Sequence, residues 1–207
     1  MKRLCVLLLA AAAAFSQYKT QPGGDPPSEI AAQIAASLAK PGTKIVDAGG
    51  AVYAEIWLRS TMPSGPNTGE QSVTLPTIPP GSVLGVIRFA TKTMDRRGQT
   101  VNPGVYTLRY GNYPVNGNHQ GAAPQRDFLL LCSAALDKNI AAISDFDALL
   151  DLARKSGGAA HPSVLSFWKS DADQKAGFEK QGEHDWVLTT KIGDVAVSII
   201  LIGKVEE

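Results

Sequence analysis

Three histidines are the side chains of this sequence best suited to acid–base or metal chemistry. They are His119, His161 and His184, and each lies in a segment predicted to be a loop. None has a second ligand at the spacing of a His-x-His or His-Glu-x-x-His motif, so the sequence shows no metal signature. A site assembled from several loops stays open as an alternative, with His119, Asp127 and His161 as its candidate residues. Its chemistry would be hydrolysis or metal-dependent catalysis.

The pattern of nucleophiles and carboxylates does not indicate an active site. The chain has no Gly-x-Ser-x-Gly turn, which would in any case need a strand–helix framework to expose its serine. Cys132 follows the apolar run 128–131, where a thiol is ordinarily buried and has a raised pKa. Glu55 and Asp127 are conceivable as a carboxylate pair, but no pattern fixes their separation, on which glycoside hydrolysis depends. We therefore predict no catalytic residues, no metal and no cofactor.

Aromatic and amide side chains favour ligand binding instead. The predicted loop 111–126 is rich in Asn and Gln and follows a strand that ends at Tyr110. A loop of this length in a compact domain usually has a function, although an ordinary solvated loop has a similar composition. Aromatic rings beside amide groups can hold sugars by stacking and hydrogen bonds. We predict that Tyr110, Tyr113, His119 and Asp127 bind a neutral polar ligand such as a glycan.

The N-terminal residues predict a secretory signal peptide. Lys2 and Arg3 precede an unbroken apolar run over 4–14, and small residues favour cleavage between Ser16 and Gln17. This run is too short to span a bilayer core, which needs about 20 apolar residues. The prediction is a secreted or periplasmic protein with no membrane span after cleavage.

The charge balance argues against a polyanionic partner. The chain has 20 Lys and Arg against 19 Asp and Glu, and loss of Lys2 and Arg3 with the signal leaves 18 against 19. So little net charge gives no electrostatic attraction for nucleic acid or for an anionic membrane surface. Cleavage also removes Cys5, so Cys132 is left without a partner for a disulfide within the mature chain.

Periodicity predicts a mainly β chain with two short helices. Ile30, Ile34 and Leu38 repeat every four residues and predict the first helix. Ser144 is predicted to cap the second helix, which ends at Gly157. Alternating or continuous apolar runs predict the strands. These strands cover residues 44–47, 51–59, 83–90, 106–110, 127–134, 163–169, 186–191 and 195–202.

The segment 95–108 joins a turn and a Pro-Gly corner to a strong strand. Its defining residues are Asp95, Gly98, Val101, Pro103, Gly104, Tyr106 and Leu108. This pattern resembles a strand pair of exported bacterial β-sandwich modules, which include immunoglobulin-like and carboxypeptidase-regulatory-like domains and secreted proteins of unknown function. The resemblance implies export and an antiparallel β-sandwich, either a decorated immunoglobulin-like module or a jelly roll. It brings no catalytic residues with it.

The predicted organisation is a signal peptide over 1–16, a flexible leader over 17–27 and a single β-sandwich domain over 28–207. We favour an exported, noncatalytic module that binds a ligand or has a role in the cell envelope. Its predicted partner is a glycan or another envelope protein. The alternative is a hydrolase or a metal-dependent enzyme with its site among the loops.

Overall fold

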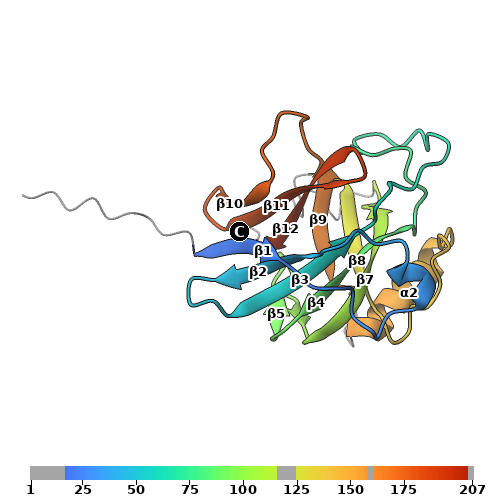
Figure 1. Ribbon diagram of the computed structural model, residues 1–207. Helices are drawn as coiled ribbons and strands as arrows, with labels where there is room; N and C mark the ends of the chain where they lie inside the picture. Colours follow the sequence, from blue (N-terminus) through green and yellow to red (C-terminus); the bar gives the residue numbers. More distant parts are fainter. Residues whose placement is uncertain (1–16, 116–124, 158–160, 205–207) are drawn as a thin grey trace, which may run out of the picture.

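The computed structural model of the chain describes residues 17–115, 125–157 and 161–204. These residues form one sheet of ten strands, a ribbon of two strands and two helices (Figure 1). The main sheet contains β1 (Tyr18–Pro22), β2 (Thr43–Asp47), β3 (Val52–Leu58), β4 (Val83–Phe89), β7 (Gly104–Asn112), β8 (Asp127–Ser133), β9 (Val164–Lys169), β10 (Gly177–Gln181), β11 (Asp185–Ile192) and β12 (Val195–Ile202). The ribbon contains β5 (Thr93–Met94) and β6 (Thr100–Val101), and the helices are α1 (Ala32–Ala35) and α2 (Phe146–Gly157).

The main sheet is antiparallel throughout and nearly closes on itself. Its strand order is β1-β2-β3-β4-β7-β8-β9-β12-β11-β10. The two edge strands, β1 and β10, contact each other, and Tyr18 packs edge-on against Phe178 and Trp186 there. The prediction of a mainly β, antiparallel fold with two helices is confirmed. Two separate stacked sheets, which a β-sandwich requires, are not confirmed.

The interior of this curled sheet is filled by side chains. Alternate residues of each strand point inward, as the two-residue period of a strand requires, and they form one continuous apolar core. The largest fully buried members of this core are Tyr110, Phe167, Ile45, Ile56, Ile78, Leu84, Ile87, Leu108 and Leu129.

Strand β8 is buried on both faces, as its continuous apolar run predicts. Leu129 and Leu131 belong to the inner core, whereas Leu130 and Cys132 belong to a separate cluster under α2. Burial raises the pKa of the Cys132 thiol to about 12, and the negative charge of Asp137 adds to the effect. The prediction that Cys132 is buried packing is confirmed.

The first helix is shorter than its periodicity predicts. Only Ala32–Ala35 is helical, and no side chain caps its N-terminus. The hydroxyl of Ser28 lies against Glu29 rather than against the helix backbone. The apolar pattern is still used, because Ile30, Ile34 and Leu38 are buried in one cluster with Trp57.

The prediction of a flexible leader over 17–27 is wrong for its first part. Residues Tyr18–Pro22 form β1, which pairs with β2 from Tyr18↔Asp47 to Pro22↔Thr43. Strand β10, at the other edge, is also absent from the sequence prediction. Both edge strands are mostly exposed and polar, since main-chain hydrogen bonds hold them and no apolar alternation is needed. An edge position also tolerates Pro22.

Candidate functional site

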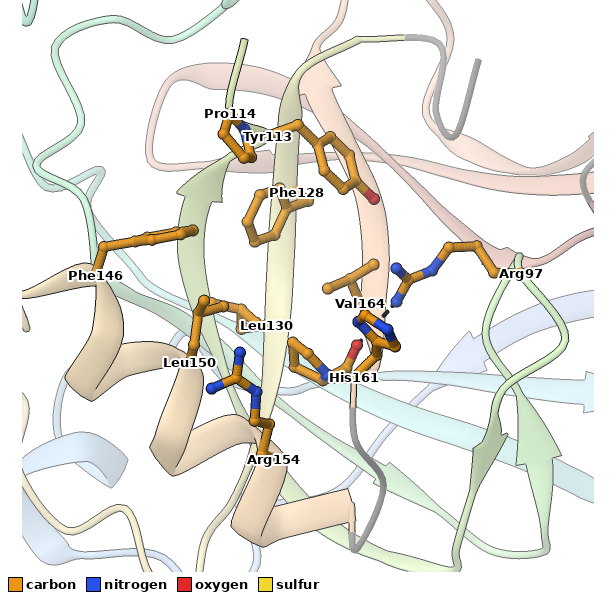
Figure 2. A pocket seen from close by; sticks show the side chains of 11 residues that line it. Arg97, Tyr113, Pro114, Phe128, Leu130, Phe146, Leu150, Arg154, His161 and Val164 are labelled. Carbon is orange, nitrogen blue, oxygen red and sulfur yellow. Dashed lines mark hydrogen bonds between the residues drawn. The ribbon is translucent and has the colours of Figure 1, made fainter. Parts of the chain in front are cut away.

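A pocket of about 210 Å³ lies between α2 and the outer face of β8 and β9 (Figure 2). Its walls come from the sheet, from one face of α2, and from the segments that flank β7 and β9. Apolar and aromatic side chains form most of the lining, and the charged members are cationic. This combination of a concave apolar surface with a few polar groups is typical of a small-molecule site.

The floor of the pocket is set by strand register. Phe128 and Leu130 are two residues apart on β8 and therefore share its outer face. The pairing of Leu130 with Val164 adds a third apolar side chain from β9. Gly111 of β7 lies opposite Phe128, where a Cβ atom would approach the ring to 2.8 Å. A glycine at this position therefore leaves room for the Phe128 ring.

The helical wall of the pocket is one row of α2. Phe146, Leu150 and Arg154 are spaced by four residues, so they follow one another along the same face. The adjacent face packs Leu149 and Ala153 into the cluster over β8. Each of these last two side chains is fully buried. The helix therefore presents two apolar groups and then a cation to the pocket.

The cap of α2 differs from the sequence prediction. The backbone N–H of Ala148 donates to Oδ1 of Asp145 at 3.1 Å, and that of Leu149 donates to the Asp145 carbonyl oxygen at 3.0 Å. Asp145, rather than Ser144, therefore caps the N-terminus. Its negative charge also suits the positive end of the helix.

The polar part of the lining consists of Arg97, Arg154 and His161, and no acidic residue is among the described residues that line the pocket. Nη2 of Arg97 donates to Oδ2 of Asp95 at 3.2 Å and to the Pro162 carbonyl oxygen at 2.8 Å. Arg154 is 42% exposed, and its Nη1 lies 3.0 Å from Asp151, the only partner that the described residues give it. The pocket is therefore apolar inside and positive at its margin.

Arg97 is held in place by the turn between β5 and β6. The buried carboxylate of Asp95 accepts the backbone N–H groups of Arg97 and Gln99 at 3.0 and 2.9 Å. Gly98 has φ +80°, which suits glycine in this turn. The Gln99 amide donates to the carbonyl oxygen of His161. The turn is thereby docked against the segment that precedes β9.

Two of the predicted ligand-binding residues lie in the core instead of on a binding surface. Tyr110 is 1% exposed and Asp127 is fully buried. The Tyr110 hydroxyl donates to Oδ1 of Asp127 at 2.7 Å, while Oδ2 accepts the backbone N–H of Thr74 at 2.8 Å. Burial raises the pKa of Tyr110. These contacts fasten the segment before β4 to the sheet, so the ring of Tyr110 is not available for stacking.

The position of β7 explains this difference. The strand continues to Asn112, which pairs with Asp127, so Tyr110 lies inside the strand rather than at its end. In β8, Asp127 shares the inner face with Leu129, and its carboxylate points into the molecule. The prediction of an exposed Tyr110 ring is therefore wrong.

Tyr113 and His161 line the pocket, and they come from the segments after β7 and before β9. The ring of Tyr113 lies 4.6 Å from that of Phe128, centroid to centroid, and burial raises its pKa. His119 lies outside the described residues. His161 is on the outer side of the sheet and Asp127 on the inner side, so the structure does not bring these two together.

Sequence reasoning finds Tyr113 but misses both arginines of the pocket. Arg154 has a local signal, because it continues the apolar row of Phe146 and Leu150 at the same spacing. Arg97 has none, since its role depends on the docking of the turn between β5 and β6 against Pro162.

Within the described ranges, no three His, Cys, Asp or Glu side chains are grouped so that they could hold a metal ion. Over the same part of the chain, no helix is both long and apolar enough to cross a membrane. Comparison with models of protein families, with curated protein sequences and with solved structures finds no match to this chain.

Proposed function

We propose that this chain is an exported, noncatalytic binding protein for a small molecule, which it holds between α2 and the outer face of β8 and β9. The observation that carries this proposal is the pocket of about 210 Å³, with an apolar floor and two arginines at its margin. Such a lining suits an apolar molecule with a negative group better than the neutral glycan suggested by loop composition.

The polar groups of the pocket support binding rather than catalysis. Proton transfer is most efficient when the pKa of the group lies near the working pH. Burial moves the pKa of Tyr113 upward, away from neutrality. His161 has no carboxylate beside it in the described lining that could orient its ring. Within the described lining, His161 therefore lacks the partner that would orient it as an acid–base catalyst.

The position of β1 supports the export part of the proposal. This strand begins at Tyr18, two residues after the predicted cleavage point at Ser16. Removal of residues 1–16 would therefore leave the whole sheet intact. A secreted or periplasmic location follows from the predicted signal peptide.

Filling the pocket should abolish binding while the fold remains. In the variant Leu150→Trp, the indole would occupy the space beside Phe128, and we expect the affinity for small aromatic ligands to fall at least about tenfold. Fluorine NMR titration of the purified protein with 4-fluorobenzyl alcohol and 4-fluorophenylacetate measures this affinity.

The matched control is Ala148→Trp, which places the same side chain on the exposed face of α2. We expect its affinity to equal that of the wild type, and the thermal unfolding midpoint of each variant checks its fold. If neither compound binds the wild type at millimolar concentration, the proposed function is wrong. Equal affinities for Leu150→Trp and the wild type would show that the site lies elsewhere.

A further inference from the structure

The size of the pocket limits the ligand to about one ring and a short substituent. Its volume is about 210 Å³, whereas a dry apolar cavity of about 150 Å³ is enough for benzene. A sugar chain or a long acyl chain would extend far outside the walls. A six-membered ring with a substituent of a few atoms fills the space.

The apolar side chains indicate that this ring is aromatic. Tyr113 from the segment after β7, Phe128 of β8 and Phe146 of α2 all line the pocket, with the Phe128 ring between the other two (Figure 2). The rings of Tyr113 and Phe128 are tilted by 45°. Phe146 is 39% exposed, an unusual exposure for a large apolar side chain next to a core cluster. A ligand ring would cover Phe146 and add a tilted or edge-on contact at the usual separation of about 4.5 to 7 Å.

The two arginines indicate a carboxylate. Figure 2 shows Arg154 away from the three aromatic rings, at the far end of the α2 row, and Arg97 on the opposite side of the pocket from α2, near Tyr113. Arg97 donates to its protein partners through Nη2, and the described residues leave its Nε and Nη1 for a ligand. A guanidinium group binds a planar carboxylate with two parallel hydrogen bonds.

Arg154 can exchange its present partner for such a ligand with little loss of stability. Its present partner, Asp151, is 60% exposed, and the pair lies at the surface of α2. Exposed pairs of this kind contribute little stability. A ligand carboxylate in the less solvated pocket would therefore compete well with Asp151 for the guanidinium group.

From the size, the rings and the charges together we infer that the ligand is an aromatic monocarboxylate about the size of phenylacetate. Its ring packs against Phe128 and Phe146, its carboxylate pairs with Arg154, and Arg97 adds positive charge on the other side of the pocket. This inference rests on the proposed function, because it assigns the ligand class of the same pocket.

The test compares three compounds in the purified protein: 4-fluorophenylacetate, its neutral amide and hexanoate as an aliphatic acid. Fluorine NMR measures the dissociation constants of the two aromatic compounds, and displacement of 4-fluorophenylacetate measures that of hexanoate. We expect the aromatic acid to bind about tenfold more tightly than the amide. We expect it to bind at least about fivefold more tightly than hexanoate.

Arg154→Gln should weaken binding of the acid about five- to twentyfold and leave binding of the amide unchanged. Arg154→Lys, which keeps the charge and loses the planar fork, should restore part of the affinity. The control is Lys155→Gln, which removes the same charge from the next residue of α2 and does not touch the pocket. Arg154 is partly exposed, so none of these substitutions is expected to disturb the fold.

The outcomes separate the two proposals. Equal affinities for acid and amide, with no effect of Arg154→Gln, would overturn the carboxylate assignment and leave the pocket as a binding site. Hexanoate binding as tightly as the aromatic acid would overturn the aromatic assignment. Failure of all three compounds to bind would overturn the proposed function itself.

Discussion

Replacing Asp137 with alanine is expected to lower the free energy of unfolding by about 3 to 5 kcal/mol, because Arg109 would be left as a buried charge without its partner. Nε and Nη2 of Arg109 donate to the two oxygens of Asp137 at 2.6 and 2.7 Å. The remaining donors reach the carbonyl oxygens of Gly81, Asn139 and Ala141. All five N–H groups of a fully buried guanidinium are thus satisfied.

Urea unfolding measures this loss, and Asp173→Ala is the control, because it removes the same charge from an exposed position. The double variant Arg109→Met, Asp137→Leu should lose less stability than Asp137→Ala, since it leaves no buried charge behind. A loss below about 1 kcal/mol for Asp137→Ala would mean that this ion pair does not hold the loop after β8.

Truncating Leu129 to alanine is expected to cost about 2 to 5 kcal/mol of unfolding free energy. Leu129 is fully buried in the inner core, between Tyr110 of β7 and Leu165 of β9 in the strand register. The sheet is hydrogen-bonded on both sides of β8, so its walls cannot collapse easily into the space that the side chain leaves.

The matched control for this truncation is Leu136→Ala, since Leu136 is 52% exposed. We expect it to change the unfolding free energy by less than about 0.5 kcal/mol in the same urea titration. Similar losses for the two variants would show that β8 is not the centre of the core.

Strands with an apolar pattern are predicted from sequence, whereas the edge strands are not. The run from Phe128 to Cys132 indicates a strand covered on both faces, and the structure places it between the inner core and α2. β1 and β10 have no such pattern, because main-chain pairing holds them at the edges. Their contact with each other, which nearly closes the sheet, joins residues far apart in sequence and has no local signal.

The candidate site is predicted only in part, for a related reason. Loop composition draws attention to Tyr113, which lines the pocket, and equally to Tyr110 and Asp127, which are buried in the core. The register of β7 and β8 determines which of these side chains lines the pocket and which two are buried. Arg97 joins the pocket through a turn that docks on Pro162, a tertiary contact that composition and periodicity do not contain.

The most direct test of the proposed pocket is to locate a bound ligand by intermolecular NOEs. The measurement uses the ring protons of 4-fluorophenylacetate and the methyl groups of Leu130 and Leu150, which line the pocket from β8 and α2. We predict NOEs from the ring to both leucines in the wild type, and loss of the NOE to Leu130 in Leu150→Trp. A bound ligand that shows NOEs to neither leucine would contradict the assignment of this pocket as the binding site.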